Sequence, residues 1–322
     1  MSYGYVDTHC HFLSPTIEEA FEDHDIDVAA IEGFPVPRYG QDWTVEKHLD
    51  NARCNGIGLS FLSYSAPFPH FGDEAALVEI CRQSNDMLAE IKLEHPDEIG
   101  FSALLPVPYM DAAIAETRRS ICDLNADGVK LPSNVDGLYL GAKEYDPLFE
   151  VLDELNAVVT IHPEQPPVIP QDVFTAGPLP LFEYVGDTTR AVTNMIANGT
   201  VEKYPNISFL VPHCGSFLPA VIYRLNGMMN NVLIPKGLAD PCDVLGQIKS
   251  MYFDVAGDAL PAALGALITM VGTEKLVYGS DFPYTPGPAI TQKQKALLEC
   301  AELADCQEDV FRNNALRLFK RI

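Results

Sequence analysis

Short runs of apolar or alternating side chains recur along the chain, and a stretch with helical periodicity follows each run. Runs rich in Val, Ile, Leu and Phe are typical of parallel strands that are covered by helices. Strands are predicted at residues 3–9, 58–64, 99–105, 127–131, 157–162, 207–213, 251–256 and 276–281. Helices are predicted at 45–54, 74–94, 112–124, 147–155, 188–198, 219–229, 259–271 and 291–303, with a last helix at 308–321.

This alternation predicts an α/β fold of the (β/α)8 TIM-barrel type, whose strands place their carboxyl ends around one rim. We expect a single domain over residues 1–322. An open, doubly wound sheet is the alternative that the pattern leaves open. Residues 12–43 and 163–186 are rich in proline and too long for ordinary βα connections, so we expect loop insertions that act as lids or subunit contacts.

The composition and net charge limit the classes of molecule that the protein is expected to bind. Lys and Arg number 21 against 45 Asp and Glu, a formal charge of -24, which argues against a nucleic acid or an anionic membrane surface as partner. No apolar run approaches the roughly 20 residues of a membrane-spanning helix, and no signal peptide is evident, so a cytoplasmic location is predicted. The eight cysteines lack C-x-x-C spacing and are expected to be free thiols.

Histidines occupy the ends of several predicted strands. His9 and His11 are two positions apart on the first strand, so they share one face and can reach a single ion. Taken alone, such a pair is equally an ordinary feature of a strand end. His162 ends the fifth predicted strand, His213 the sixth and Asp281 the eighth.

On a barrel these strand ends become neighbours at the carboxyl rim. A single histidine there is better interpreted as a hydrogen-bonded polar residue, but His9, His11, His162 and Asp281 together favour a metal site. Imidazole and carboxylate donors suit zinc, and also manganese, cobalt or iron(II), so the ligand types do not select the metal.

These residues stand in motifs that resemble the metal-dependent amidohydrolase superfamily, and more narrowly its nonoxidative decarboxylases. That branch includes the aminocarboxymuconate semialdehyde, γ-resorcylate and 6-methylsalicylate decarboxylases, but hydrolases and a hydratase share its motifs. The resemblance covers nearly the whole chain and rests on Asp7-Thr8-His9-Cys10-His11, Ile161-His162-Pro163, Asp187-Thr188-Thr189-Arg190-Ala191, Tyr204-Pro205, Pro212-His213-Cys214-Gly215 and Gly279-Ser280-Asp281-Phe282-Pro283.

The resemblance implies one divalent metal ion per subunit, Zn2+ or Mn2+, with His9, His11, His162 and Asp281 as its ligands. It implies that His213 is a catalytic histidine outside the ligand set. An open coordination position generates hydroxide near neutral pH or holds a substrate oxygen, and a neighbouring imidazole can move a proton. His213 could instead bind a second metal.

Lys130 ends the fourth predicted strand and is expected to face the same rim. Three roles stay open for it: binding an anionic group of the substrate, forming a structural ion pair, or bridging two metals as a carboxylated lysine. An arginine is also expected to pair with the substrate carboxylate. Arg38 and Arg53 are preferred over Arg190 and Arg224, because related decarboxylases use an arginine from early in the chain or from a neighbouring subunit.

The leading hypothesis is a metal-dependent carboxy-lyase that acts on a small aromatic or dienoic acid such as a hydroxybenzoate, with Asp281 or His213 as the acid that protonates the ring carbon. The alternative is a hydrolase of a lactone or amide that uses metal-activated water. A catalytically idle binding protein is a third possibility. The long loops and the family resemblance favour a homodimer or a higher homo-oligomer.

Overall fold

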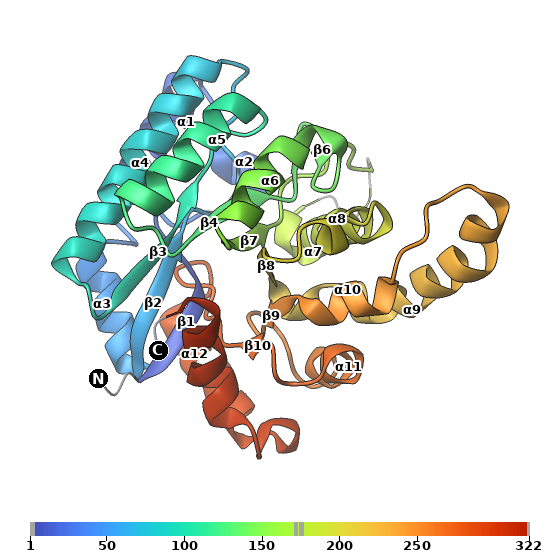
Figure 1. Ribbon diagram of the computed structural model, residues 1–322. Helices are drawn as coiled ribbons and strands as arrows, with labels where there is room; N and C mark the ends of the chain where they lie inside the picture. The colour runs from blue at the N-terminus through green and yellow to red at the C-terminus, as the bar shows by residue number, and fades with distance from the viewer. Residues whose placement is uncertain (1–3, 171–172, 174–176, 321–322) are drawn as a thin grey trace.

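Eight parallel strands follow one another around a single sheet in the order β1-β2-β3-β4-β7-β8-β9-β10 (Figure 1). The structure is a computed structural model, and it describes residues 4–170, 173 and 177–320. The strands are Tyr5–His11 (β1), Ile57–Ser63 (β2), Ile99–Leu104 (β3), Gly128–Pro132 (β4), Val158–His162 (β7), Ser208–Val211 (β8), Tyr252–Asp254 (β9) and Leu276–Val277 (β10). Every predicted strand is found, although residue 3 lies outside the described residues.

The segment after β10 returns to β1 and nearly closes the ring. The amide nitrogen of Thr8 donates to the carbonyl of Tyr278 at 2.9 Å, and that of His11 donates to the carbonyl of Phe282 at 2.7 Å. The amide nitrogen of Asp281 donates back to the carbonyl of His9 at 2.7 Å. The (β/α)8 barrel is therefore confirmed and the open sheet is excluded, because an open sheet leaves its first and last strands unpaired.

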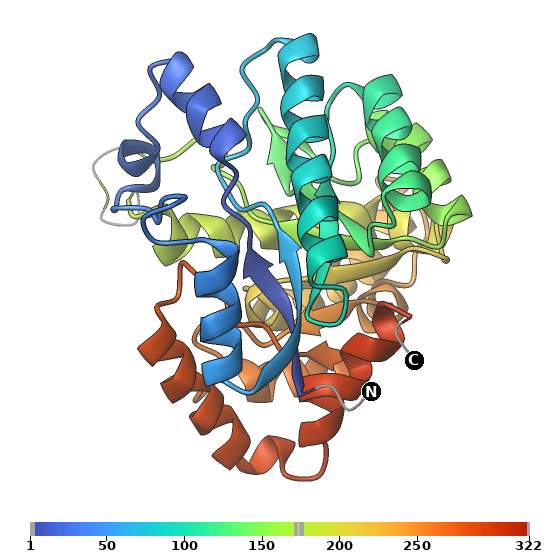
Figure 2. The same ribbon diagram turned by 90° about the vertical axis from the view of Figure 1, so that its left-hand side faces the viewer.

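Helices surround the ring (Figures 1 and 2). Those at Val45–Cys54 (α3) and Glu74–Glu94 (α4) begin and end as predicted. The others are Pro15–Asp23 (α1), Val28–Glu32 (α2), Met110–Arg118 (α5), Asp146–Glu154 (α6), Leu179–Ala197 (α7), Thr200–Lys203 (α8), Leu218–Met228 (α9), Val244–Ser250 (α10), Ala263–Val271 (α11), Gly287–Glu299 (α12) and Asn314–Leu318 (α13).

The helices and strands differ from the predicted elements at several places. The stretch 12–43 holds α1 and α2, and α7 begins within the other predicted insertion, 163–186. Helix α10 has no predicted counterpart. The predicted last helix is present as a π-helical turn at Asp309–Asn313 followed by α13, and residue 321 lies outside the described residues. A two-stranded antiparallel hairpin, Asn134–Val135 (β5) and Leu138–Tyr139 (β6), follows β4.

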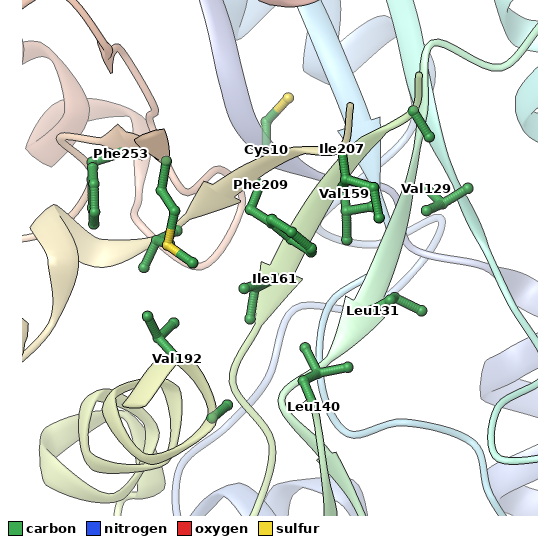
Figure 3. Close-up of a cluster of buried hydrophobic side chains, with 14 of the residues drawn as sticks. Cys10, Val129, Leu131, Leu140, Val159, Ile161, Val192, Ile207, Phe209 and Phe253 are labelled. Atoms are coloured by element: carbon green, nitrogen blue, oxygen red, sulfur yellow. The ribbon is translucent and has the colours of Figure 1, made fainter. Parts of the chain in front are cut away.

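The main hydrophobic core lies between the strands and the helices (Figure 3). Val129 and Leu131 of β4 belong to it, as does Cys10 of β1, which is fully buried. Because side chains alternate along a strand, Lys130 points into the ring. Cys10 is the packing residue that its position opposite His9 and His11 predicts. No helix in the described part of the chain is long and apolar enough to cross a membrane.

Candidate metal centre

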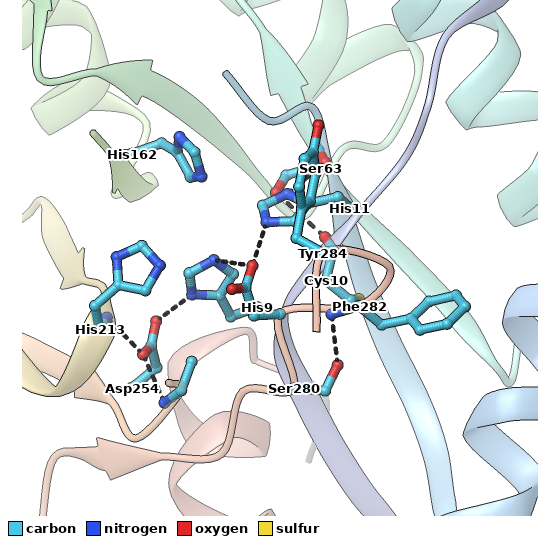
Figure 4. A network of polar contacts seen from close by, with 12 residues as sticks. His9, Cys10, His11, Ser63, His162, His213, Asp254, Ser280, Phe282 and Tyr284 are labelled. Atoms are coloured by element: carbon cyan, nitrogen blue, oxygen red, sulfur yellow. Dashed lines mark hydrogen bonds and ion pairs between the residues drawn. The ribbon is translucent and has the colours of Figure 1, made fainter. Parts of the chain in front are cut away.

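The end of β1 brings two imidazoles to the middle of the rim (Figure 4). The pairing of β1 with β2 shifts register between Asp7 and Cys10. His9 lies within that interval and His11 follows it, and both imidazoles face the cluster. The Nε2 atom of His11 lies 3.0 Å from Oδ1 of Asp281, and the Nε2 atom of His9 lies 3.6 Å from the same oxygen. Atoms of β1 and of the loop after β10 therefore converge on one point.

A third imidazole completes the cluster. His162 ends β7, and its Nδ1 lies 2.9 Å from the carbonyl of Pro163, which leaves Nε2 free to face the other histidines. Its ring centre lies 5.2 Å from that of His11. The nearest ligand atoms of His9, His11 and His162 all lie within 4.8 Å of one another, and so do those of His9, His213 and Asp281.

These residues fit a divalent metal. The Nε2 atom of His9 is buried and has no hydrogen-bond partner among the described residues, and a buried polar atom without a partner is costly unless a ligand satisfies it. Burial lowers the pKa of His11 to about 3 and holds the pKa of His162 well below its ordinary value. Both rings are therefore neutral, which is the form that binds metals.

The pKa values of Asp281 and His9 show that the cluster favours positive charge. Burial opposes ionisation of Asp281, but its hydrogen bond with His11 and the neighbouring histidines hold its pKa below the ordinary range. Burial likewise opposes protonation of His9, but Asp254 and then Asp281 outweigh it, and the pKa of His9 lies above its ordinary value. A cation between these side chains is thus electrostatically favoured.

His213 reaches the cluster through a turn with unusual backbone geometry. His213, Cys214, Gly215 and Ser216 all have positive φ, at 55°, 54°, 73° and 56°. Only glycine adopts that region freely, and each other residue there costs about 1–2 kcal/mol. The turn brings the ring centre of His213 to 4.9 Å from that of His9. The Nδ1 atom of His213 is buried without a hydrogen-bond partner in the described part of the chain.

Asp254 is a residue of the centre that the sequence analysis missed. It ends β9 and is 1% exposed. Its Oδ2 lies 2.7 Å from Nδ1 of His9, and its Oδ1 accepts hydrogen bonds from the amide nitrogens of His213 at 2.9 Å and Ala256 at 3.0 Å. The available signal was a lone carboxylate at the end of an otherwise apolar strand.

Lys130 lies behind His11. Its Nζ is 3.1 Å from Oγ of Ser63 and 3.4 Å from Nδ1 of His11, on the side of the ring away from Asp281. No described carboxylate lies within ion-pair distance of it, so the structural ion pair is not found. Burial lowers the pKa of Lys130 to about 7, although Glu164 opposes the shift. Its place behind His11 also disfavours a bridge between two metals.

Arg38 and Arg53 are not brought to the cluster, and here the sequence interpretation needs correction. Arg53 lies in the last turn of α3, shortly before β2, and its guanidinium pairs with Glu98 at 3.1 Å, just before β3. It therefore lies at the amino end of the barrel, opposite the rim. Arg38 pairs with Glu22 at 2.5 Å and lines a separate cavity of about 380 Å³ under α1 and α2. Neither is retained as a substrate-binding residue of its own subunit.

The other two arginines also lie outside the cluster. The guanidinium of Arg190 is 2.9 Å from the hydroxyl of Tyr139 and 3.3 Å from Asp187. Arg224 is exposed on α9. All four arginines considered from the sequence are therefore engaged elsewhere or directed to solvent within this subunit.

The cluster opens into a cavity of about 620 Å³, which we call the main cavity. His162, His213 and Asp281 line it, together with apolar side chains that include Phe34 and Leu181. Among its described lining residues the only lysine or arginine is Lys293, whose Nζ is 3.0 Å from Asp258. The wall toward α1 contains Ala66 and Tyr284, and both residues also line the smaller cavity.

Comparison with known proteins agrees with this geometry. The family model described as amidohydrolase matches residues 6–321. The chain belongs to the amidohydrolase family. This amidohydrolase is 32% identical to 6-methylsalicylic acid decarboxylase of Penicillium expansum, over 98% of this chain and 96% of that protein. The superfamily suggested by the motifs is thereby confirmed.

Solved structures share the fold over the same length. A crystal structure described as amidohydrolase II is 34% identical, with a TM-score of 0.91, and the match covers 98% of this chain and 99% of that one. The 5-carboxyvanillate decarboxylase of Novosphingobium aromaticivorans, solved with manganese and a nitrobenzoic acid, is 21% identical with a TM-score of 0.84. That match covers 99% and 96% of the two chains.

Proposed function

We propose that this amidohydrolase is a metal-dependent nonoxidative decarboxylase of a small aromatic acid, most plainly a hydroxybenzoate. The observation that carries the proposal is that His162, His213 and Asp281 meet at one part of a cavity that also has apolar walls. Such a cavity suits a ring whose polar substituents lie together at the reacting end. The full-length similarity to a protein named 6-methylsalicylic acid decarboxylase supports the same substrate class.

His9, His11, His162 and Asp281 would hold one divalent ion, with zinc or manganese as the candidates. A related 5-carboxyvanillate decarboxylase was solved with manganese, which supports the second. When bound, the ion would supply a Lewis acid that orients the acidic end of the substrate and withdraws electron density from its oxygens. The second-metal role of His213 is not adopted, since Lys130 is not placed to bridge.

We assign proton transfer to His213. Decarboxylation of an aromatic acid needs a new carbon–hydrogen bond at the ring carbon that carries the carboxylate, after which the carbon–carbon bond breaks and carbon dioxide leaves. Asp281 stays ionised because its pKa is lowered, so it is the weaker proton donor. His213 has a free Nδ1 beside the main cavity and a ring that titrates below its ordinary pKa because of burial, which suits exchange of a proton.

The carboxylate of the substrate needs a cation, and the subunit offers few. Lys130 lies near the cluster, and Lys293 in the main cavity is already paired. We propose that a second copy of the chain completes the environment in a homodimer. Exposed apolar side chains on α7, on α9 and directly before α9 support this: Leu181, Phe182, Phe217, Tyr223 and Met228. Light scattering during gel filtration measures the subunit number, and a monomer at all concentrations would contradict the dimer.

The function is tested on the purified, metal-loaded protein with a panel of hydroxybenzoates. Release of carbon dioxide with a matching phenol is expected, and His213→Asn is expected to keep the metal while turnover falls by about 10²–10⁴-fold. Full activity of that variant would remove His213 from the chemistry. A carbon-conserving ring opening of a lactone would instead support the hydrolase alternative. The cytoplasmic location stays a prediction from the sequence.

A further inference from the structure

We infer that Asp254 is a positioning residue that couples metal binding to the placement of His213. The carboxylate is buried at the end of β9, between the metal cluster and the left-handed turn at 213–216. Figure 4 shows it reaching His9 on one side and the backbone at His213 on the other. This inference rests on the proposed metal site, and it adds a residue to which no role has yet been assigned.

One oxygen of Asp254 fixes the ring of His9. The Oδ2 atom lies 2.7 Å from Nδ1 of His9, and both side chains are buried. The Nε2 atom of His9 faces the cluster and has no partner among the described residues. An imidazole that binds a metal through Nε2 carries its proton on Nδ1, and a carboxylate acceptor at Nδ1 selects that tautomer and orients the ring.

The other oxygen holds the main chain. The Oδ1 atom accepts from the amide nitrogen of His213 at 2.9 Å and from that of Ala256 at 3.0 Å. Because His213 has a left-handed φ of 55°, its conformation needs contacts that offset the strain. The hydrogen bond to Asp254 is one such contact. The amide nitrogen of Ser216 donates to the carbonyl of His213 at 2.8 Å and supplies another.

A carboxylate is required because each oxygen has its own task. An asparagine at 254 has one acceptor oxygen, so it can accept from the His9 ring or from the backbone amides but not from both. If its amide nitrogen faces His9, it donates to Nδ1 and favours the tautomer that has its proton on Nε2. That tautomer cannot bind a metal through Nε2. If the amide nitrogen of the asparagine instead faces the backbone, it meets the amide nitrogen of His213, and two hydrogen-bond donors then face each other without an acceptor.

The test measures metal affinity and turnover separately. Asp254→Asn and Asp254→Ala are loaded with metal, and metal loss is followed by chelator competition. We expect metal affinity to fall by about 10–100-fold in both variants. At saturating metal, kcat of Asp254→Ala is expected to fall by about 10-fold or more, since a displaced His213 is poorly aligned for proton transfer.

Asp7→Asn is the matched control. Asp7 is also buried beside His9, but its Oδ1 accepts from the amide nitrogens of His9 at 3.1 Å and Ser280 at 3.0 Å, as an amide oxygen can. The Ser280 side chain is a further hydrogen-bond partner of this carboxylate, and none of these contacts involves the His9 ring. Its metal affinity is expected to stay within about 3-fold of the wild type, because the His9 ring keeps its acceptor. Equal losses of metal affinity in the Asp7 and Asp254 variants would show that any change in a buried carboxylate near His9 disturbs the site, and this result would overturn the inference.

Two other outcomes overturn the inference in whole or in part. Asp254 variants that hold metal as tightly as the wild type remove Asp254 from the metal site. Asp254 variants that lose metal affinity but reach the wild-type kcat at saturating metal would show that Asp254 does not position His213. Failure of the wild-type protein itself to bind a metal would contradict the proposed function instead, and that result is read from the same titration before any variant is compared.

Discussion

Two buried lysines of this amidohydrolase have different surroundings. Lys92 of α4 is 7% exposed, and its Nζ lies 2.9 Å from Asp127 and 2.6 Å from the carbonyl of Asn125. Lys130 of β4 is 3% exposed, and the groups nearest its Nζ are the hydroxyl of Ser63 and the ring of His11. Lys92 lies near the amino ends of the strands, whereas Lys130 lies at the site.

The difference separates a structural cation from one that is available to a ligand. A buried ammonium is compatible with the fold when a carboxylate and hydrogen-bond acceptors surround it, as at Lys92. No described carboxylate lies within ion-pair distance of Lys130, and burial lowers its pKa to about 7 although Glu164 opposes the shift. The fold thus retains the buried Lys130 beside the metal centre, although it destabilises the folded state. Groups of this kind are typical of functional sites.

The largest effect is expected at Lys92. The change Lys92→Met leaves Asp127 buried without its cation, and we expect it to destabilise the protein by about 3–5 kcal/mol. Urea unfolding measures the change. The double variant Lys92→Met with Asp127→Asn removes both charges and is expected to recover part of the loss. A single-variant effect below about 1 kcal/mol would contradict a structural role for the pair.

His48 extends the comparison to a buried base without a partner. It is 1% exposed, neither ring nitrogen has a hydrogen-bond partner among the described residues, and burial lowers its pKa to about 4. The unfolded chain binds this proton near pH 6.5 and the folded protein only near pH 4. Its contribution to stability is therefore present above pH 6.5 and lost as the pH falls toward 4.

The change His48→Phe should remove this pH dependence. Over the full window it amounts to about 3 kcal/mol, and the difference in unfolding free energy between wild type and variant measures it at each pH. A constant difference from pH 7.5 to pH 4 would show that His48 does not stay neutral on folding. The control His24→Phe replaces a histidine that is exposed on the surface, and it measures what the loss of a histidine does without the burial of His48.

Metal removal should lower the unfolding free energy of the protein through the site beside Lys130, whereas the contacts of Lys92 do not involve the metal. At a free metal concentration of 100 times Kd, the bound ion stabilises the fold by about 2.7 kcal/mol, and a chelator removes that amount. Thermal unfolding with and without chelator measures it. The variant His9→Ala lacks a ligand and should respond much less, and an equal response in both proteins would place the metal elsewhere.

The smallest change in stability is expected at Lys130. Replacement by Met removes a buried charge that has no carboxylate partner, so we expect stability to rise by about 1 kcal/mol. Activity should fall, because the site loses the cation nearest the cluster. A destabilisation as large as that of Lys92→Met would show that the two lysines serve the same structural purpose.

Much of the fold and part of the site could be predicted from the sequence. Apolar runs located the strands, and alternation along β1 placed His9 and His11 on one face, because both signals are local. Asp254 showed only as a lone carboxylate in an apolar strand, and that signal does not reveal its role, which depends on a left-handed turn that follows a different strand. Arg53 was misplaced because its position at one barrel end or the other depends on how α3 packs, which no motif reports.

The turn at 213–216 has a consequence for the evolution and design of this protein. Each of its residues adopts a backbone conformation that β-branched side chains tolerate worst. Random substitution of Cys214 and Ser216 should therefore yield few working sequences, enriched in glycine, asparagine and aspartate. Transplanting the site onto another barrel would require grafting this short loop as a unit, along with the carboxylate beneath it, rather than copying the histidine alone.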